Sequence, residues 1–99
     1  MLHIVNKSHA ERNALSSCLR LAQDGHALLL IEDGVLSATA AAAPASGIAA
    51  ASGRLKVYAL AGDVAARGLA GKLAAGVTEV DYAGFVDLVT EHKTCQSWL

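Results

Sequence analysis

Apolar residues occur along the chain in short blocks. Most of these blocks contain some polar residues, but one contains none. Residues 27–31 read Ala-Leu-Leu-Leu-Ile and are apolar at every position. A strand with this pattern has both faces buried, as in a parallel sheet that helices cover on both sides. Further blocks predict strands at residues 2–6, 54–60 and 77–80. The apolar end of the chain, residues 94–99, predicts either a fifth strand or docking into a neighbour.

The residues between the first two predicted strands show the spacing of apolar positions that is typical of a helix. Ser8 and Glu11 have the spacing of a capping box, and Gly25 is a typical residue at a helix end. The pattern therefore predicts a helix that begins at Ser8 and stops at Gly25. Its apolar positions recur at intervals of three and four residues: Ala14, Leu15, Cys18, Leu19, Leu21 and Ala22.

Later intervals also predict helices. Residues 35–43 read as a helix that stops before Pro44. A loop at residues 61–63 leads into a short helix at residues 64–69. Asp81 is a typical N-cap for the last helix. The inner face predicted for that helix consists of Tyr82, Phe85, Val86 and Val89.

Strands that alternate with helices predict a three-layer α/β/α sandwich with a small, mainly parallel sheet of about five strands. A chain of 99 residues is long enough for one modest core, so we expect a single domain over residues 1–99. Residues 38–52 are rich in alanine. They predict either a weakly specified helix and loop or a close-packing face for a partner subunit.

Composition narrows the classes of function. Hydrophobic residues make up 54% of the chain and charged ones 17%, so part of the apolar surface is expected to lie in a subunit interface. The net charge is −1 and the basic residues form no stripe, which argues against direct nucleic-acid binding. We read neither a signal peptide nor a membrane span, and expect a cytoplasmic protein.

The residues that could carry chemistry are few. Cys18 lies on the apolar face of a predicted helix, where burial makes a thiol inert, whereas Cys95 follows two potential cations that favour a thiolate. Glu32 and Asp33 lie at a strand exit, and either orient a partner's basic residue or a loop amide or are simply solvated. We expect no metal site and no cofactor, since the four histidines lack ligand spacing and the glycines match no phosphate-binding motif.

Six segments of the chain resemble the DsrH/TusB family of small sulfur-relay subunits. The resemblance covers both ends and the first third of the chain, at residues 2–8, 11–15, 18–19, 29–34, 81–88 and 96–99. It implies the DsrEFH-like fold, a small flavodoxin-like arrangement.

The resemblance also implies a place in a cytoplasmic persulfide sulfurtransferase complex. The expected partners are TusC/DsrF-like and TusD/DsrE-like paralogous subunits in a dimer of trimers, and a downstream TusE/DsrC-like sulfur carrier. The expected product is the 2-thio group of the wobble uridine in transfer RNA, with oxidation of stored sulfur as the alternative. Alone, the chain either associates with itself or stays a monomer.

The same resemblance assigns roles to residues. Cys18 occupies the position of the cysteine kept in the DsrH branch, and is the candidate sulfur-handling thiol. Catalytic paralogues carry their sulfur-accepting cysteine after the third strand, where this chain has Leu60-Ala61-Gly62-Asp63 and no thiol. The chain is therefore not expected to be catalytic alone. Two other hypotheses are a purely architectural subunit and an independent binder of a small ligand.

Overall fold

The computed structural model describes residues 1–98 and contains one five-stranded sheet in which every strand pair is parallel. The strands follow the order β4-β3-β2-β1-β5 across the sheet. This confirms the predicted fold class and the fifth strand at the end of the chain; Leu99, also part of that predicted segment, lies outside the described residues. The strands are β1 (Leu2–Val5), β2 (Ala27–Leu30), β3 (Lys56–Leu60), β4 (Val77–Val80) and β5 (Cys95–Trp98).

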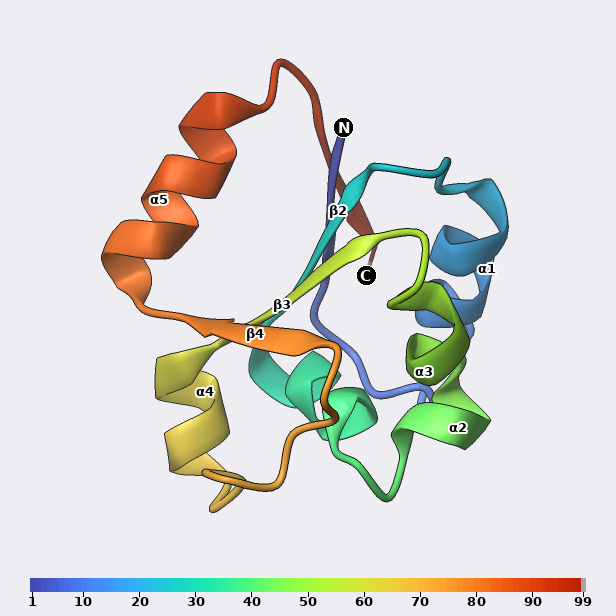
Figure 1. Cartoon of the computed structure of the whole chain (residues 1–99), viewed down its shortest axis with the longest axis vertical. Helices are drawn as coiled ribbons and strands as arrows, with labels where there is room; N and C mark the ends of the chain where they lie inside the picture. Colours follow the sequence, from blue (N-terminus) through green and yellow to red (C-terminus); the bar gives the residue numbers. More distant parts are fainter. Residues whose placement is uncertain (99) are drawn as a thin grey trace.

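Helices cover the two faces of the sheet unequally (Figure 1). All but one of the helical segments of residues 1–98 lie between β1 and β4 in the chain and cover one face of the sheet. Only α5 lies on the opposite face. The segments are α1 (Ala14–Leu21), the 3-10 helix η1 (Glu32–Ala38), α2 (Ala43–Ser46), α3 (Ile48–Ala51), α4 (Ala61–Ala66) and α5 (Tyr82–Glu91).

The strand order explains this division. From β1 to β4 the chain moves across the sheet in one direction, and right-handed crossovers then place every connecting helix on the same face. The connection from β4 to β5 runs back past β1, so its helix lies on the other face. Flavodoxin, by contrast, reverses direction between its first and third strands. Because only the connection from β4 to β5 crosses that face, one outer layer of the sandwich consists of the single helix α5.

The core lies on both faces of the central strand β2, whose four residues are all buried. Leu28 and Leu30 join the larger cluster, which α1 and η1 cover. Leu29 joins a smaller cluster on the opposite face with Leu2 and Leu88 of α5. The uninterrupted apolar block in the sequence is therefore a strand buried on both sides, as predicted.

The start of α1 differs from the prediction. Its N-cap is Asn13 and the helix begins at Ala14, so Ser8 and Glu11 form no capping box. Instead the Ser8 carbonyl accepts from the backbone N–H of Glu11, which closes a separate turn. This turn is held to η1, because the backbone N–H of His9 donates to Ser37 Oγ at 2.9 Å and its ring Nδ1 lies 2.9 Å from the same oxygen.

The end of α1 also differs from the prediction. The helix ends at Leu21, and Ala22 is already extended, with a ψ of 135°. The guanidinium of Arg54 stabilises this end because it donates to the carbonyls of Ala22 and Leu19. Gly25, with a φ of +86°, belongs to the turn before β2 rather than to the helix end.

The helix predicted over residues 35–43 is replaced by the 3-10 helix η1, followed by an irregular stretch. Pro44 lies in the first turn of α2, where its missing N–H costs no helical hydrogen bond. Ala38, Ala43 and Ala51 are buried in the chain's own larger cluster. Part of the alanine-rich stretch is therefore small-residue packing inside this protein.

Two further predictions are corrected in the second half of the chain. Residues 61–63 are the first turn of α4 and not a loop. In α5 the capping role of Asp81 is confirmed, since its Oδ1 accepts from the N–H of Gly84 at 2.8 Å. The predicted inner face is confirmed at Phe85 alone, which packs on the sheet together with Leu88, a residue that the prediction did not include. Three of the four residues predicted to face inward are exposed: Tyr82 by 72%, Val86 by 43% and Val89 by 39%.

Candidate functional site

Cys18, the candidate sulfur-handling residue, lies in the middle of α1 and is fully buried. Its side chain belongs to the larger apolar cluster together with Leu15 and Leu30. Burial raises the pKa of the Cys18 thiol to about 11, against a smaller opposite effect of the Arg54 guanidinium. At pH 7 only about one such thiol in ten thousand is ionised. In this conformation Cys18 is a neutral packing group that a sulfur donor does not reach.

Cys95 has the opposite surroundings. It is the first residue of β5, an edge strand, and it is exposed. Its register partner on β1 is Leu2, so Cys95 points to the face of the sheet that carries α5. Cys18 lies under the opposite face. The two thiols therefore cannot form a pair across this sheet.

The exits of β2 and β3 carry a polar network. Arg67 of the α4 end donates from Nε to Asp33 Oδ1 at 2.9 Å, and its Nη1 lies 3.6 Å from Asp63 Oδ1. Asp63 also accepts from the backbone N–H of Glu32 at 2.7 Å. That bond holds Glu32 in the left-handed region, at a φ of +49°, which is uncommon for a residue with a side chain.

This network decides part of what the sequence left open. The carboxylate of Asp33 binds Arg67 of its own chain rather than a partner's basic residue, and the loop amide at this exit, that of Glu32, is bound by Asp63 rather than by Glu32 or Asp33. The spacing of Asp63 and Arg67, four residues apart, was the available signal for their ion pair. The pairing with Asp33 was not readable, because it joins the ends of neighbouring strands.

A second polar network lies at the opposite edge of the sheet. The indole N–H of Trp98 donates to His3 Nδ1 at 3.1 Å, and His3 Nε2 lies 3.0 Å from His26 Nδ1. His26 Nδ1 also accepts from the backbone N–H of Gln23. His3 Nδ1 and His26 Nδ1 both accept hydrogen bonds, so neither nitrogen carries a proton. His3 therefore carries its proton on Nε2, and both imidazoles are neutral. Protonating either accepting nitrogen would set two donors against each other.

The pKa values of both imidazoles follow from this arrangement. Burial lowers the pKa of His3 below its ordinary 6.5, with smaller effects from His26 and the N-terminal amino group. Burial also lowers the pKa of His26, with contributions from the N-terminal amino group and His92. His92 itself ends α5, with Nδ1 2.8 Å from the Leu88 carbonyl. Two of the histidines, which lie in different segments of the sequence and lack metal-ligand spacing, are thus brought together by the strand register.

These lowered pKa values predict a pH dependence of stability. Groups that bind protons more weakly in the folded state stabilise it above their unfolded pKa, here about 6.5, and lose that contribution as the pH falls through the folded values. We expect the free energy of unfolding, measured with urea, to fall between pH 7.5 and 5.5. The variant His3→Gln should show a smaller slope, and equal slopes in both proteins would contradict the network.

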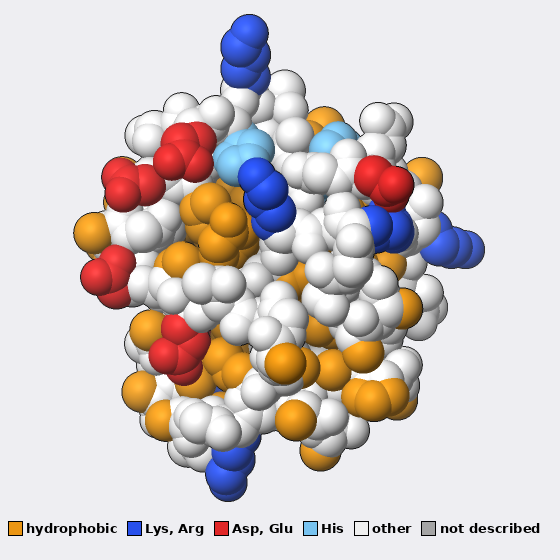
Figure 2. Space-filling model, in the orientation of Figure 1, with side chains coloured by type: hydrophobic (Ala, Val, Ile, Leu, Met, Phe, Trp, Pro, Cys, Tyr) orange, Lys and Arg blue, Asp and Glu red, His pale blue; other side chains and the backbone are white. Residues whose placement is uncertain are grey.

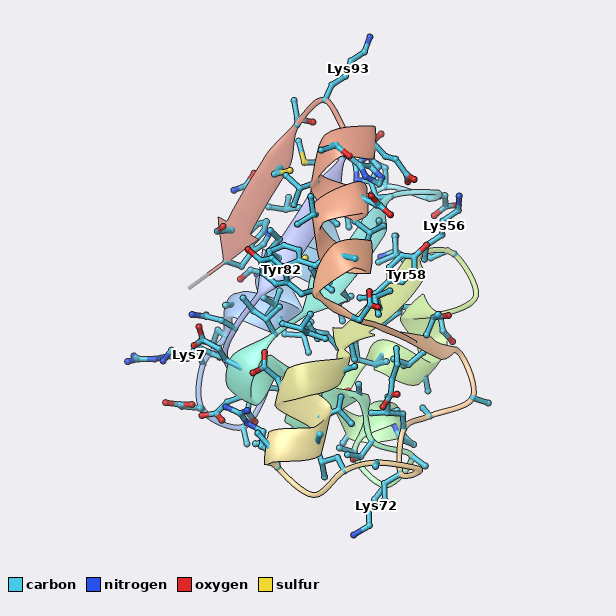
Figure 3. The ribbon with its side chains drawn as sticks, turned by 90° about the vertical axis from the view of Figure 1, so that its left-hand side faces the viewer. Lys7, Lys56, Tyr58, Lys72, Tyr82 and Lys93 are labelled. Atoms are coloured by element: carbon cyan, nitrogen blue, oxygen red, sulfur yellow. The ribbon has the colours of Figure 1, made fainter. Side chains whose placement is uncertain are left out.

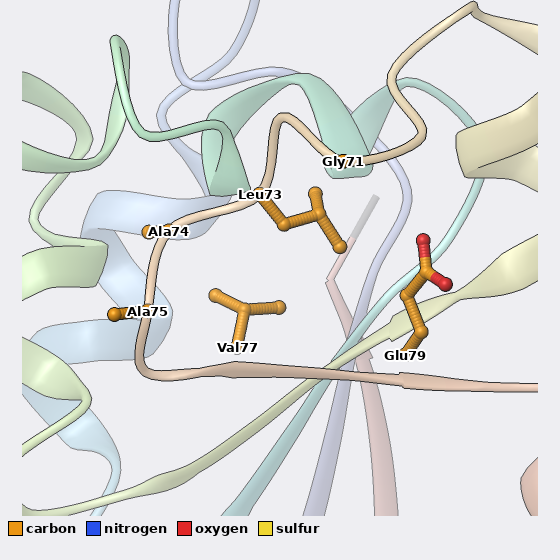
Figure 4. A pocket seen from close by; sticks show the side chains of 6 residues that line it. All are labelled: Gly71, Leu73, Ala74, Ala75, Val77 and Glu79. Carbon is orange, nitrogen blue, oxygen red and sulfur yellow. The ribbon is translucent and has the colours of Figure 1, made fainter.

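Open depressions lie along the segment that joins α4 to β4. One, of about 440 Å³, is lined by the loop before β4 and by the face of β4 beside it (Figure 4). Its charged lining residue is Glu79, and its other walls are small or apolar. This lining offers no nucleophile and no base–nucleophile pair. The lining residues are Gly71, Leu73, Ala74, Ala75, Val77 and Glu79.

No group of three or more histidine, cysteine or acidic side chains in residues 1–98 could hold a metal ion. None of the helices built from these residues has the length and apolarity needed to cross a membrane.

Comparisons with known proteins give a match to a family model and a match to a solved structure. Residues 7–95 match the family model described as "DsrH like protein". No curated protein matches the chain. Among solved structures, the chain is similar to a protein of unknown function, MTH1491 from Methanobacterium thermoautotrophicum. The TM-score is 0.74 at 18% sequence identity, and the match covers 97% of this chain and 95% of that one. This likeness supports the fold.

Proposed function

Because this chain belongs to the DsrH-like family, whose members are subunits of sulfur-relay complexes, we propose that it is the non-principal subunit of a persulfide relay. The relay delivers the 2-thio group of the wobble uridine in transfer RNA. In this proposal the chain assembles in the cytoplasm with TusC/DsrF-like and TusD/DsrE-like paralogues, as a dimer of trimers. The assembled complex hands its sulfur to a TusE/DsrC-like carrier.

The chemistry of a relay step sets what a sulfur-accepting thiol needs. A thiolate attacks the outer sulfur of the donor persulfide, the donor's S–S bond breaks, and the donor leaves as its own thiolate. The acceptor must therefore be accessible and ionised. Cys18 is fully buried and its pKa is raised to about 11. The exit of β3, where Ala61 begins α4 directly, carries no cysteine.

The burial of Cys18 is the observation that supports an architectural role best. In this proposal the chain shapes the complex and the sulfur-accepting thiol belongs to a paralogous subunit. A second candidate role keeps Cys18 as a sulfur carrier. It would require α1 to move away from the larger cluster when the complex assembles, at the cost of exposing Leu15 and its neighbours.

Replacing Cys18 separates the two roles. We expect Cys18→Ala in the assembled complex to leave the rate of 2-thiouridine formation within about twofold of wild type, because it removes only a small packing group. The assay would contain a cysteine desulfurase, the paralogous subunits, the carrier and transfer RNA. Cys95→Ser is the matched control at an exposed thiol. A loss of more than about tenfold in an intact Cys18→Ala complex would favour the carrier role.

A further inference from the structure

The last strand of the sheet is held to the molecule largely by one side chain. Cys95, Gln96 and Ser97 of β5 are exposed, and Trp98 is the residue of this strand that is partly buried. Its indole packs against the larger cluster, and the indole N–H donates to His3 Nδ1 at 3.1 Å. Beyond β5 the sheet has no further strand among residues 1–98. Besides the backbone pairing with β1, the contacts of Trp98 are therefore what fixes β5 in place.

Two imidazoles connect Trp98 with the turn before β2. His3 of β1 is only 3% exposed, and its Nε2 lies 3.0 Å from Nδ1 of His26. Nδ1 of His26 also accepts from the backbone N–H of Gln23 at 3.2 Å. These contacts form one chain from the edge strand, across β1, to the turn at residues 22–26. We call the side chains of His3, His26 and Trp98 the histidine latch.

The latch tolerates only one arrangement of protons. Both Nδ1 atoms accept a hydrogen bond, so each must lack a proton. A proton on His3 Nδ1 would face the indole N–H. A proton on His26 Nδ1 would face the Gln23 N–H and the Nε2–H of His3. Either protonation therefore removes a hydrogen bond and leaves two donors in opposition.

The rings themselves offer little to replace the lost bond. The centroids of His3 and Trp98 are 6.2 Å apart, whereas a cation is attracted to an indole when it lies within about 6 Å of the ring centre. The centroids of His3 and His26 are 5.2 Å apart, so two protonated imidazoles would repel each other. Because His3 lies on an inner strand and Trp98 on an edge strand, movement of Trp98 is the easier way to relieve the conflict.

The charged groups around the latch do not compensate a protonated imidazole. The ion pairs found among residues 1–98 involve neither His3 nor His26, and Asp24 is paired with Arg54 at 3.5 Å. Apart from Glu91, which is exposed, the other ionisable groups on the surrounding elements are neutral or positively charged. They are Cys18 and Arg20 of α1, Lys56 of β3, Glu91 and His92 at the end of α5, Lys93 and Cys95 at the start of β5, and the N-terminal amino group.

The figures show how these groups are arranged. Figure 2 shows histidine side chains at the surface near the end of the molecule where the chain begins, with basic and acidic groups around them. Figure 3 shows Lys93 extending into solvent before β5, and Lys56 on the other side of α5 from β5. The two lysines therefore leave the outer edge of β5 open.

We propose that the histidine latch is a pH-sensitive device, which holds β5 on the sheet when both imidazoles are neutral and releases Trp98 and β5 when either imidazole is protonated. The rest of the domain stays folded, because the buried residues of both clusters lie outside β5. Release of β5 leaves the backbone edge of β1 free to pair with another strand. This inference does not rest on the proposed function.

The direction of the response follows from proton linkage. In the closed form burial lowers the pKa of both imidazoles below the ordinary 6.5. In the open form each pKa returns toward 6.5, so the open form binds protons more readily and gains population as the pH falls. At pH 5.5, one unit below 6.5, each imidazole raises the opening equilibrium by at most about tenfold.

Hydrogen exchange of the backbone amides of β5, followed by NMR between pH 7.5 and 5.5 and corrected for the intrinsic exchange rate, tests the latch. We expect the opening equilibrium of β5 to rise by at least about threefold over this range. The amides of β5 should also be less protected than those of β2 at every pH, because β5 opens while the core stays folded. Equal protection of the two strands, or an opening of β5 that is independent of pH, would overturn the proposal.

Two substitutions keep the acceptors of the latch but remove its titration. In His3→Asn and His26→Asn the side-chain oxygen takes the place of Nδ1 and binds no proton in this pH range. The double variant should hold the opening of β5 constant within about twofold between pH 7.5 and 5.5. His9→Asn is the matched control, since His9 contacts Ser37 outside the latch, and it should respond like wild type. A wild-type response in the double variant would contradict the latch.

Trp98→Phe tests the indole N–H without changing a histidine. It keeps an aromatic ring against the larger cluster but removes the donor that faces His3 Nδ1. The opening of β5 should be larger than in wild type at pH 7.5, because a hydrogen bond is lost. Its rise on acidification should be smaller, because a proton on His3 no longer meets a donor. A rise as large as that of wild type would overturn the proposal.

Discussion

Gly34→Ala is expected to destabilise the protein by about 2–4 kcal/mol, although it adds only one methyl group. Gly34 lies in η1, directly after β2, where the chain passes close to the end of β1. A Cβ at this position would lie 2.4 Å from the carbonyl oxygen of Val5. That oxygen is fixed, because it accepts from the backbone N–H of Ile31 at 3.0 Å. Relief of the clash would therefore move η1 away from the sheet.

Urea unfolding at pH 7.5 measures this effect, and Gly62→Ala provides the matched control. Gly62 lies in the first turn of α4, and a Cβ there meets no atom within 4 Å. Because alanine favours a helix, Gly62→Ala should be neutral or stabilising by up to about 1 kcal/mol. Equal effects of the two substitutions would show that the contact between η1 and β1 is looser than the structure indicates.

Leu30→Ala is expected to destabilise the protein by about 2–5 kcal/mol. Leu30 is fully buried in the central strand, and it packs in the larger cluster against Cys18 and Val35. Leu30 itself lies on β2, which is hydrogen-bonded to a strand on each side, so the backbone cannot easily move into the space left behind. A domain of this size has a total stability of about 5–15 kcal/mol, so this single change removes a large part of it.

The midpoint of thermal unfolding reports this loss, and Leu21→Ala is its control. The side chain of Leu21 is 67% exposed, so shortening it should change the stability by no more than about 0.5 kcal/mol. We expect the melting temperature of Leu30→Ala to fall by more than about 10 °C. A fall of only a few degrees would contradict the tight packing around β2.

The sheet was the part of the fold that the sequence predicted well. Residues 27–31 are apolar without interruption, and only a strand buried on both faces satisfies that pattern in a chain of this length. For the end of the chain the sequence left two possibilities, a fifth strand or docking into a neighbour, and the structure shows a strand whose Trp98 packs against the larger cluster. Strand order, in contrast, depends on contacts between segments far apart in the sequence.

The helix boundaries were predicted less well, because tertiary contacts override local signals. Ser8 and Glu11 have the spacing of a helix cap. In the structure this segment is a separate turn, which the hydrogen bond from His9 to Ser37 holds against η1. Arg54, more than thirty residues away, stabilises the end of α1 at Ala22. In α5 the residues assigned inward were Tyr82, Phe85, Val86 and Val89, and Leu88, the buried residue of the helix, was not among them. The thin layer on this face leaves contact for Leu88 and Phe85 but not for Tyr82.

The candidate site was predictable in part. Burial of Cys18 followed from its position on the apolar face of a helix, and the structure places it in the core. The contact between His3 and His26 was not readable, because the two residues lie at the ends of neighbouring strands whose register the sequence does not specify.

Persulfide mapping of the loaded complex tests the central claim most directly. The complex with its paralogous subunits would be loaded by a cysteine desulfurase, alkylated, digested and analysed by mass spectrometry. The account predicts that the extra sulfur atom appears on a cysteine of a paralogous subunit, and that Cys18 and Cys95 of this chain stay unmodified. Extra sulfur on Cys18, at an occupancy comparable to that of the partner's cysteine, would contradict it.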